Sequence, residues 1–299
     1  MDKKILITGA AGFIGRQLSD RLKSRGAKVV QVDNLSEKPI LEPQKDLILC
    51  DVQQLDTKNL SDLQIDTIVH LAAKKNVKDS FFNLNNSIEN YEMTIKLFDA
   101  AVRSGVKKVF LASTCEIFGF QSDKLGENAK YKPHSPYVVS KVANEYLSDI
   151  YMMLDKNVKF TSLNFFNTYG PSEGLDAVIP NFVSKAIKNE TIKIEGDGSQ
   201  ARDFTYIDDT IDVLFDIILS DKYFRSVNIG SGLRISVNDI LNIIKSSFPK
   251  LNFEHVDARP NEIKYFEADN DLIKNTFSFD PKTNIEDGIK KVINFHKTR

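Results

Sequence analysis

The sequence is poor in the residues from which disulfide frameworks and metal sites are built. It has two cysteines and four scattered histidines among 299 residues, so neither a disulfide scaffold nor a metal cluster is expected. The formal net charge is −1, which gives no reason to expect a nucleic-acid partner or an anionic membrane surface. No apolar run approaches membrane-spanning length, and the N-terminus enters an apolar strand at once, which leaves no room for a signal peptide. We therefore expect a cytoplasmic protein without a metal.

What the chain does contain is a regular alternation of short apolar runs and amphipathic stretches. The apolar residues within 87–103 recur at helical spacing, Gly105 provides a stop, and 108–112 is predicted to be the next strand. Strands that alternate with helices in this way predict an α/β fold with a doubly wound parallel sheet, in which ligands lie outside the carboxyl ends of the strands. The strand at 108–112 therefore delivers residues 113–119 to the active-site edge.

A glycine-rich segment near the N-terminus joins the first predicted strand to the first predicted helix. The apolar run 5–7 is followed by Thr-Gly-Ala-Ala-Gly-Phe-Ile-Gly, an amphipathic stretch, a second apolar run over 29–32 and then Asp33. The first glycine permits a tight turn, the second lets backbone N–H groups approach a pyrophosphate, and the third lets the helix lie close to the strand. The helix N-terminus then faces the phosphates, so the segment predicts a dinucleotide site. The residues of this segment that we expect to contact the cofactor are Gly9, Ala11, Gly12, Phe13 and Ile14.

Asp33 selects between the two nicotinamide dinucleotides. A carboxylate at the end of the second strand can accept hydrogen bonds from both ribose hydroxyls of adenosine but repels a 2′-phosphate. The residues that follow, Asn34, Leu35 and Ser36, include no arginine to receive that phosphate. We therefore predict NAD as the cofactor. The alternative is that Asp33 is an ordinary solvated aspartate at a strand end.

Two further strands are expected to end at the cofactor. Asp51 follows a predicted strand over 47–50 and can meet the adenine amino group, although an ordinary turn aspartate would occupy the same position. The predicted strand over 67–73 ends in small residues that let a cofactor approach the backbone, and a lysine after it can reach phosphate or the nicotinamide ribose. A solvated loop charge is the default for such a lysine. The further cofactor contacts that we expect are Asn34, Asp51, Val52, Leu71, Ala72, Ala73 and Lys75.

Tyr137 and Lys141 lie four residues apart in a predicted helix that begins after the Pro-His-Ser-Pro segment 133–136. Residues at this spacing share one helix face. A lysine ammonium, like the positive nicotinamide of NAD⁺, favours the phenolate form of the tyrosine. The phenolate can then take a proton from a substrate hydroxyl as hydride leaves for the cofactor. Tyr-x-x-x-Lys is common on helix surfaces, but behind a glycine loop and with Thr114 ahead of it the pattern indicates an alcohol-oxidation site.

The alternation of strands and helices breaks after residue 170, which divides the chain into two expected domains. We predict an NAD-binding Rossmann domain over 1–170, with 205–230 returning to its sheet, and a smaller substrate-binding lobe over 171–299. A chain of this length is sufficient for one large domain or for two unequal ones.

These residues together resemble the extended short-chain dehydrogenase/reductase family, and in particular its NAD-dependent nucleotide-sugar epimerases and dehydratases. The resemblance covers almost the whole chain. The motifs that carry it are the glycine loop, His70-Leu71-Ala72-Ala73, Asn90, Tyr137 with Lys141, Phe165-Phe166-Asn167 and Arg202-Asp203-Phe204. The resemblance implies a nucleotide-sugar substrate, with UDP-sugars favoured, in the smaller lobe. It also implies a homodimer in which helices 87–104 and 137–155 pair between subunits.

The resemblance implies roles for individual residues as well. Thr114 and Tyr137 would hold the 4-hydroxyl of the sugar, and Lys141 would hold the nicotinamide ribose. Asn90 would contact the cofactor. The residues that would bind the nucleotide part of the substrate are Asn167, Ile179, Arg202 and Arg259. Arginine is suited to this task because its guanidinium can contact phosphate in a bidentate manner.

The two residues after Thr114 differ from those usual in an epimerase. Epimerases of this family usually carry small, inert residues here, 4,6-dehydratases carry Thr-Asp-Glu, and decarboxylases carry Thr-Ser-Glu. This chain has Cys115 and Glu116. Together with Phe-Phe-Asn at 165–167 and Arg-Pro-Asn-Glu at 259–262, the segment is most similar to that of the UDP-GlcNAc 5,6-dehydratase of tunicamycin assembly. There the C4 ketone is a temporary activating group, and hydride returns to C4 after water is lost.

We therefore predict an NAD-dependent nucleotide-sugar dehydratase that acts through a transient 4-keto sugar, on a UDP-hexose such as UDP-GlcNAc. Oxidation at C4 makes the C5 hydrogen acidic, Glu116 removes it, and Cys115 can protonate the leaving hydroxyl. The alternative is a UDP-sugar 4-epimerase, in which Glu116 is only a polar wall and the ketone rotates before reduction. A catalytically silent NAD-binding scaffold is a remote alternative, against which the intact Thr114, Tyr137 and Lys141 argue.

Overall fold

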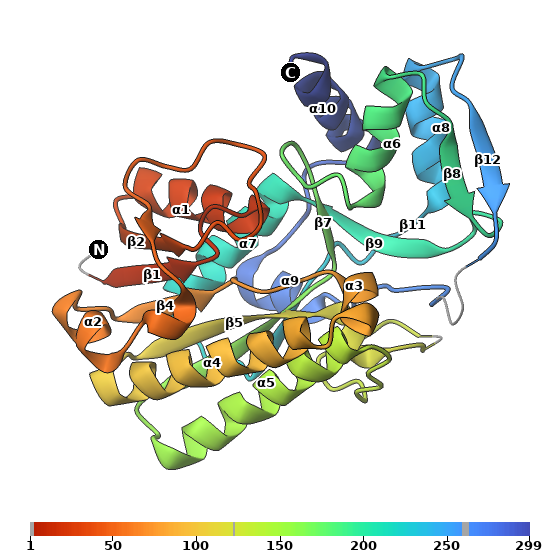
Figure 1. The fold of residues 1–299 in the computed structure, drawn as a ribbon. Coiled ribbons are helices and arrows are strands. Elements are labelled where there is room, and N and C mark those ends of the chain that lie inside the picture. Colours follow the sequence, from red (N-terminus) through yellow and green to blue (C-terminus); the bar gives the residue numbers. More distant parts are fainter. Residues whose placement is uncertain (1–2, 122, 259–262) are drawn as a thin grey trace. The chain divides into compact units, whose positions relative to one another are not determined.

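The computed structural model describes residues 3–121, 123–258 and 263–299, and the chain divides into two compact units (Figure 1). Unit 1 consists of Met1–Gly119, Ala129–Phe165 and Leu214–Val227. Unit 2 consists of Phe120–Asn128, Phe166–Val213 and Asn228–Arg299. Each unit is therefore assembled from segments that are distant in the sequence.

The larger sheet has seven strands. Their order is β10 (Ser226–Ile229), β6 (Lys159–Phe165), β5 (Lys108–Thr114), β4 (Thr67–His70), β1 (Lys4–Thr8), β2 (Lys28–Asp33) and β3 (Ile48–Leu49). The pairs β1–β2, β1–β4, β2–β3, β4–β5 and β5–β6 are all parallel. The strand order reverses at β1, which has β4 on one side and β2 on the other. This is the place where doubly wound sheets bind their ligands, and the predicted α/β fold class is confirmed.

The helices of unit 1 pack on this sheet. They are α1 (Phe13–Ser24), α2 (Thr57–Asp62), α3 (Val77–Phe82), α4 (Asn85–Ser104) and α5 (Pro136–Leu154), with the 3₁₀ turns η1 (Val52–Gln54) and η2 (Cys115–Phe118). The long helices α4 and α5 lie side by side (Figure 1). Helix α5 begins where the proline-rich entry predicts, because Ser135 caps it by accepting the Val138 N–H and Pro136 occupies its first turn. Within the residues that the structure describes, no helix combines the length and the apolar character needed to cross a membrane.

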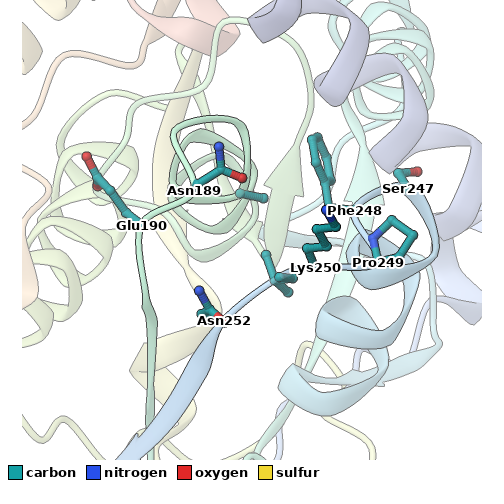
Figure 2. Close-up of a pocket in the computed structure, with 9 residues that line it drawn as sticks. Asn189, Glu190, Ser247, Phe248, Pro249, Lys250 and Asn252 are labelled. Atoms are coloured by element: carbon teal, nitrogen blue, oxygen red, sulfur yellow. The ribbon is translucent and has the colours of Figure 1, made fainter.

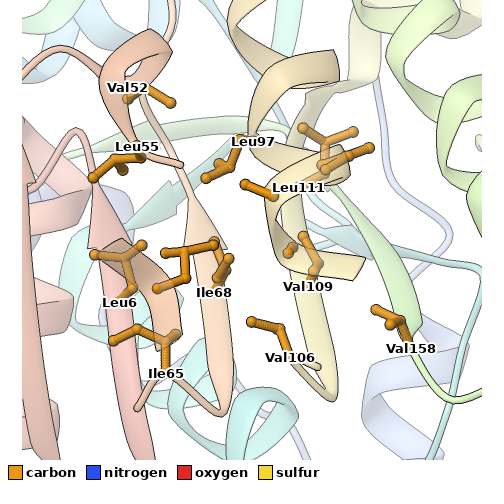
Figure 3. Close-up of a cluster of buried hydrophobic side chains, with 14 of the residues drawn as sticks. Leu6, Val52, Leu55, Ile65, Ile68, Leu97, Val106, Val109, Leu111 and Val158 are labelled. Carbon is orange, nitrogen blue, oxygen red and sulfur yellow. The ribbon is translucent and has the colours of Figure 1, made fainter. Parts of the chain in front are cut away.

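The core of unit 1 fills the space between strands and helices (Figure 3). Leu6, Ile68 and Val109, from three adjacent strands, belong to one buried cluster with Leu97 of α4, and each of the four is fully buried. Burial of such a side chain contributes about 1.5–3 kcal/mol. Close packing of this kind makes the sheet stiff, so the carboxyl ends of its strands present their residues in fixed positions.

Some strand boundaries differ from those predicted. β3 covers only Ile48–Leu49, not 47–50, because it is an exposed edge strand that pairs on one side alone. β4 ends at His70 instead of residue 73, because its neighbour β1 ends at Thr8, the register partner of His70. Residues 71–73 therefore leave the sheet, and the N–H groups of Leu71 and Ala72 donate to the carbonyl and the hydroxyl of Thr8 over 3.2 and 3.4 Å.

Unit 2 contains two small sheets. One has the order β11 (Arg234–Ser236), β9 (Ala201–Tyr206) and β7 (Asn167–Tyr169), and the other pairs β12 (Phe253–Val256) with β8 (Ile192–Glu195). The helices are α6 (Val178–Ile187), α8 (Val237–Ser247), α9 (Asp271–Phe277) and α10 (Ile285–Lys297), and α7 (Ile207–Leu219) runs from unit 2 into unit 1. Helix α10 packs closely on β7, since a Cβ at Gly288 would lie 2.0 Å from the Tyr169 hydroxyl.

Candidate active site

Gly9 allows the end of β1 to lie against the residues that follow β4. Its φ is +69°, and a Cβ at this position would lie 2.7 Å from the backbone nitrogen of Ala72. A Cβ at Gly15 would lie 2.2 Å from the carbonyl oxygen of Gly9. The Gly12 N–H closes the turn by donating to that same carbonyl over 3.1 Å. Glycine is therefore required at the first and third positions of the loop for the reasons that the sequence predicts.

The N-terminus of α1 offers backbone N–H groups to a ligand. Gly12 is the N-cap residue, no side chain in the described part of the chain caps the helix, and the first turn has no acidic residue. The N–H groups of Phe13 and Ile14 belong to this first turn, where the positive end of the helix dipole lies. A backbone cradle without a competing carboxylate fits the pyrophosphate of a dinucleotide.

The carboxylate of Asp33 ties the glycine loop to the end of β2. Its Oδ2 accepts the Ala11 N–H over 3.0 Å and its Oδ1 accepts the Leu35 N–H over 2.8 Å. A carboxylate has about four acceptor positions, so Asp33 can still accept hydrogen bonds from ribose hydroxyls. Asn34 donates to Oδ2 of Asp51 over 2.9 Å, which joins the ends of β2 and β3. This arrangement fits the adenosine end of NAD, and its negative charge would repel the 2′-phosphate of NADP.

Asp51 and Val52 follow β3 beside this carboxylate. Asp51 caps η1, because its Oδ1 accepts the Gln53 N–H over 2.8 Å. Val52 is buried in the core of unit 1. Asp51 can therefore offer a cofactor its remaining acceptor positions, and Val52 mainly its backbone.

The loop after β4 takes its shape from Asn90 of α4. The side-chain oxygen of Asn90 accepts the Lys74 N–H over 2.8 Å, and its amide nitrogen donates to the Lys74 carbonyl over 3.0 Å. Asn90 is buried, and its two hydrogen bonds to Lys74 hold the path of this loop. Lys75 is exposed at the end of the loop. The loop consists of Leu71, Ala72, Ala73, Lys74 and Lys75.

Thr114 ends β5 and caps η2. Its Oγ1 accepts the Glu116 N–H over 3.3 Å, which leaves the hydroxyl hydrogen available to donate to a substrate. Cys115 is buried, whereas the Glu116 side chain keeps 30% of its surface exposed. The end of β5 thus presents a hydroxyl, a thiol and a carboxylate in consecutive residues.

Backbone contacts hold η2 against the segment before α5. The Lys132 N–H donates to the Ile117 carbonyl over 2.8 Å. Gly119 has a φ of +59°, and a Cβ there would lie 2.3 Å from the carbonyl oxygen of Lys132. These contacts bring His134 beside Glu116, with 3.6 Å between Nε2 and Oε2.

Tyr137 and Lys141 lie one turn apart on the buried face of α5. Both side chains are buried. The Lys141 ammonium donates to the Ala112 carbonyl over 2.8 Å and lies 5.8 Å from the centroid of the Tyr137 ring. The lysine therefore joins α5 to β5 two residues before Thr114, while its charge faces the tyrosine ring.

Burial is the main influence on the protonation of this pair. Burial first, and then the nearby Glu116 and Cys115, raise the pKa of Tyr137 above its ordinary value. Burial lowers the pKa of Lys141 to about 8, and the charge of Glu145 opposes that effect. The sequence predicts that Lys141 favours the phenolate, and burial of the ring acts in the opposite direction because it disfavours the charged form.

Glu145 near this pair was not predicted from the sequence. It lies one turn after Lys141 on α5, is buried, and accepts hydrogen bonds from the hydroxyls of Ser113 and Tyr131. The signal that could have revealed it is its spacing, since Tyr137, Lys141 and Glu145 follow one another at four-residue intervals on one helix face.

The residues predicted to bind the nucleotide lie in unit 2. Asn167 begins β7 and pairs in register with Phe204 of β9. Arg202 lies two residues before Phe204 and so shares its face of the sheet. Ile179, in the first turn of α6, is buried and offers mainly its backbone. Arg259 lies outside the described residues.

Asp203 and Arg202 have different surroundings although they are adjacent. The Asp203 carboxylate is fully buried and accepts the N–H groups of Ser231 over 2.8 Å and Gly232 over 2.7 Å. The Arg202 guanidinium lies 5.4 Å from the centroid of the Phe266 ring. Asp203 therefore anchors β9 within unit 2, whereas Arg202 packs on the Phe266 ring and donates to the Ala201 carbonyl over 3.0 Å.

A hollow of about 310 Å³ in unit 2 is separate from these residues (Figure 2). Asn189 and Glu190 after α6 line one side of it, and Phe248 and Pro249 after α8 line the other. None of the predicted site residues contributes to its lining.

The sequence is similar, along almost its whole length, to proteins of one enzyme family. A sequence model of the NAD dependent epimerase/dehydratase family matches residues 5–230. A UDP-glucuronate 4-epimerase of Thermodesulfobacterium geofontis is 33% identical over 312 aligned residues, which cover 98% of this chain and 95% of the relative.

Two solved structures show the same similarity in three dimensions. One is TunA, described as an NAD dependent-NDP-hexosamine 5,6-dehydratase involved in tunicamycin biosynthesis, with a TM-score of 0.93, 34% identity, and coverage of 99% of this chain and 98% of that one. The other is the UDP-glucuronic acid 4-epimerase from Bacillus cereus in complex with UDP-glucuronic acid and NAD. It has a TM-score of 0.91, 28% identity and coverage of 99% of both chains. The similarity therefore extends to proteins with two different reaction outcomes.

Proposed function

This chain belongs to the NAD-dependent epimerase/dehydratase family, and we propose that within the family it is a nucleotide-sugar dehydratase acting through a transient 4-keto sugar. Its membership confirms the resemblance drawn from the sequence motifs, and NAD is its cofactor. The substrate that we propose is a UDP-hexose such as UDP-GlcNAc. The similarity to the 5,6-dehydratase TunA supports this choice.

The observation that carries the proposal is the position of Glu116. Glu116 lies two residues after Thr114, the last residue of β5, and its N–H donates to the threonine hydroxyl. Its side chain keeps 30% of its surface exposed, and after burial its charge contributes to raising the pKa of Tyr137. An uncharged side chain at position 116 would serve an epimerase equally well. A carboxylate beside the tyrosine that handles C4 is the group that can remove a proton from C5.

The first step is oxidation at C4. NAD, when bound, contributes a positive charge near Tyr137 and accepts hydride from C4. Thr114 and Tyr137 hold the 4-hydroxyl, and Tyr137 takes its proton. Lys141 keeps its ammonium against the Ala112 carbonyl and the tyrosine ring, which stabilises the phenolate while it forms.

The second step is elimination of water. The C4 ketone makes the C5 hydrogen acidic, and Glu116 removes it as a proton. The electron pair forms the C5–C6 double bond, and the C6 hydroxyl leaves as water with a proton from Cys115. A thiol is a weaker acid than a carboxyl group but titrates in a range that permits this transfer. Return of the hydride to C4, together with the proton held by Tyr137, would then restore the hydroxyl.

A 4-epimerase is the second candidate function. The observation that favours it is the 33% identity to a UDP-glucuronate 4-epimerase along 98% of this chain. In that reaction Thr114, Tyr137 and Lys141 have the same tasks, the ketone rotates before reduction, and Glu116 is a polar contact. The two candidates therefore share the oxidation site and differ at Glu116.

We propose that unit 2 binds the nucleotide part of the substrate. Arg202 and Asn167 lie on one face of its three-stranded sheet, and a guanidinium is suited to the diphosphate. Ile179 would contribute its backbone N–H at the start of α6, and Arg259 would add a second guanidinium. Unit 1 would then bind NAD and carry out the chemistry.

We also propose a homodimer formed through α4 and α5. Helix α5 exposes Val139, Tyr146, Ile150 and Met153 along one face, and α4 beside it exposes Ile88. Exposed apolar patches of this kind mark interaction surfaces. Isologous pairing with a second copy would bury the same stripe on both subunits. We place the enzyme in the cytoplasm, in keeping with two cysteines that form no disulfide with each other.

One experiment separates the two candidate reactions. A panel of UDP-, GDP-, dTDP- and CDP-sugars is incubated with the NAD-loaded enzyme, and the products are examined by mass spectrometry and NMR. Loss of water from a UDP-hexose supports the dehydratase. Unchanged mass with inverted C4 geometry supports the epimerase and overturns the dehydratase proposal.

A further inference from the structure

Glu145 is a buried carboxylate on the same helix face as the Tyr–Lys pair. Tyr137, Lys141 and Glu145 occupy successive turns of α5, and only 1% of the Glu145 side chain is exposed. A buried carboxylate is unfavourable unless hydrogen bonds and opposite charges compensate for lost hydration. The proposed reaction does not use this residue, so its partners indicate what it does.

The partners of Glu145 come from three separate segments of unit 1. The Ser113 hydroxyl on β5 donates to Oε1, and the Tyr131 hydroxyl, from the segment before α5, donates to Oε2. Nη1 of Arg225, just before β10, lies 3.9 Å from Oε2 and donates to the Tyr131 hydroxyl over 3.0 Å. Each carboxylate oxygen therefore has a defined partner, which fixes the rotamer of the glutamate.

The bond to Ser113 acts on the strand end that carries the catalytic threonine. Ser113 and Thr114 are consecutive residues of β5, and successive side chains of a strand point to opposite faces. The hydrogen bond from Ser113 to α5 restricts the rotation of the strand at that point, and it therefore also restricts where the next residue, Thr114, presents its hydroxyl. Glu145 thus sets the orientation of Thr114 through one intervening residue.

Glu145 is also the negative charge that compensates Lys141. Arg225 is engaged mainly by Asp149, with 2.8 Å between Nη2 and Oδ2, whereas the ammonium of Lys141 is buried and has Glu145 one turn away. His70 on β4 also senses Lys141, but burial and that charge lower the pKa of His70 to about 3. His70 is therefore uncharged near neutral pH and adds no charge beside Lys141.

The remaining groups around Glu145 and Lys141 either shift the pKa of Glu145 or carry no charge near Lys141. Burial raises the pKa of Glu145, the hydrogen bonds from Ser113 and Tyr131 lower it, and so does the charge of Arg225. Asp149 on the same helix raises it. Tyr137, the ring that Lys141 faces, is a neutral phenol in its stable form, and the carbonyl of Ala112 is a fixed dipole.

We infer that Glu145 is a positioning residue of the active site, which holds the Lys141 ammonium in its charged form and, through Ser113, orients Thr114. The inference rests on the proposed oxidation at C4. The inference holds for either candidate reaction, because the dehydratase and the epimerase both need Thr114, Tyr137 and Lys141. Glu145 touches neither substrate nor cofactor in this assignment and acts only through its two neighbours.

The test is the pH dependence of turnover in Glu145→Gln. Glutamine has the same shape and can keep an acceptor toward Ser113, but it removes the charge. We expect the alkaline limb of the kcat profile to move about one to two pH units lower, the size expected for a charge about 6 Å away at an effective dielectric constant of about 20. KM for the sugar nucleotide should change less than about twofold, because binding is not altered.

Asp149→Asn is the matched control. It removes a carboxylate from the same helix that also pairs with Arg225, but one turn farther from Lys141, so the alkaline limb should move less than about half as far as in Glu145→Gln. A loss of stability alone would lower the activity of both variants, but it would not shift the alkaline limb of either pH profile. Glu145→Gln with an unmoved alkaline limb overturns the inference.

A second variant tests the opposite sign. Arg225→Gln removes the cation that competes for Glu145, so the alkaline limb should move to higher pH. If Glu145→Gln does not fold, an unmoved or lowered limb in Arg225→Gln overturns the inference instead. The pKa of Lys141 can also be followed by NMR in isotope-labelled protein without cofactor, with Lys141→Arg used to assign the signal. We expect this pKa to fall in Glu145→Gln and to rise in Arg225→Gln. That readout does not depend on turnover, so a protein inactive toward every nucleotide sugar refutes the proposed function and still leaves the charge coupling measurable.

Discussion

Glu116→Gln is the substitution that examines the proposed reaction most directly. Glutamine keeps the size and the hydrogen-bonding shape of the side chain but cannot accept a proton from carbon. Loss of a general base lowers a rate by about 10²–10⁴-fold, which corresponds to about 3–5 kcal/mol of barrier. Elimination of water should slow by this factor. Oxidation at C4 should be no slower, because the charge of Glu116 raises the pKa of Tyr137 and its removal makes the phenol a better acid.

The two half-reactions are read separately in the same sample. Reduced nicotinamide is followed by its ultraviolet absorbance after mixing with the sugar nucleotide, and loss of water is followed by mass spectrometry. The variant should accumulate reduced cofactor and 4-keto sugar while forming little dehydrated product. Wild-type enzyme in D₂O should exchange the C5 hydrogen or carry solvent deuterium into the product.

Two outcomes would refute this reasoning in different ways. Water loss that continues at the wild-type rate in Glu116→Gln removes the carboxylate from the role of base. Clean inversion at C4 with retention of the C5 hydrogen in wild type identifies an epimerase. His134→Gln is the matched control, because it removes the neighbour 3.6 Å from Glu116 but leaves the base in place. It should retain more elimination activity than Glu116→Gln.

Three further predictions concern the cofactor, the base at C4 and the subunit contact. Asp33→Ala should narrow the preference for NAD over NADP in direct titration, and a wild-type preference for NADP would show that the carboxylate is not the selector. Tyr137→Phe should lower the rate of reduced-nicotinamide formation about 10²–10⁴-fold while both ligands still bind, and near-normal turnover would place the base elsewhere. Ile150→Glu should convert a dimer to a monomer in light scattering, with Lys156→Glu beyond α5 as control, and an unchanged mass would exclude this face as the contact.

The glycine loop could be predicted because its constraints are local. Gly15 is required by its contact with Gly9, six residues earlier, and the pattern of strand, turn and helix lies in consecutive residues. The contact of Gly9 with Ala72 joins distant segments, but the positive φ of Gly9 belongs to the turn itself. The same is true of the Tyr137 and Lys141 pair, whose spacing alone places both on one helix face. The parallel sheet follows from the alternation of strands and helices in the same way.

Contacts between distant segments could not be predicted in this way. Ser113 and Glu145 are 32 residues apart, and nothing in either segment marks the other as its partner. The side chain of Asn90 bonds to the backbone of Lys74, 16 residues away, and nothing in the sequence around either residue marks that contact. The protonation of Tyr137 depends on burial, which only the folded chain determines. The short strand β7 escaped notice because three residues carry too little periodicity.

The contact between Gly119 and Lys132 makes the turn after Thr114 a fixed frame with exchangeable side chains. The frame is set by a glycine with positive φ, by the Lys132–Ile117 backbone hydrogen bond and by the threonine cap. None of these involves the side chain of residue 115 or 116. A different side chain at either position therefore leaves these three contacts in place. The same backbone can therefore support different reactions of the keto sugar through substitutions at these two positions.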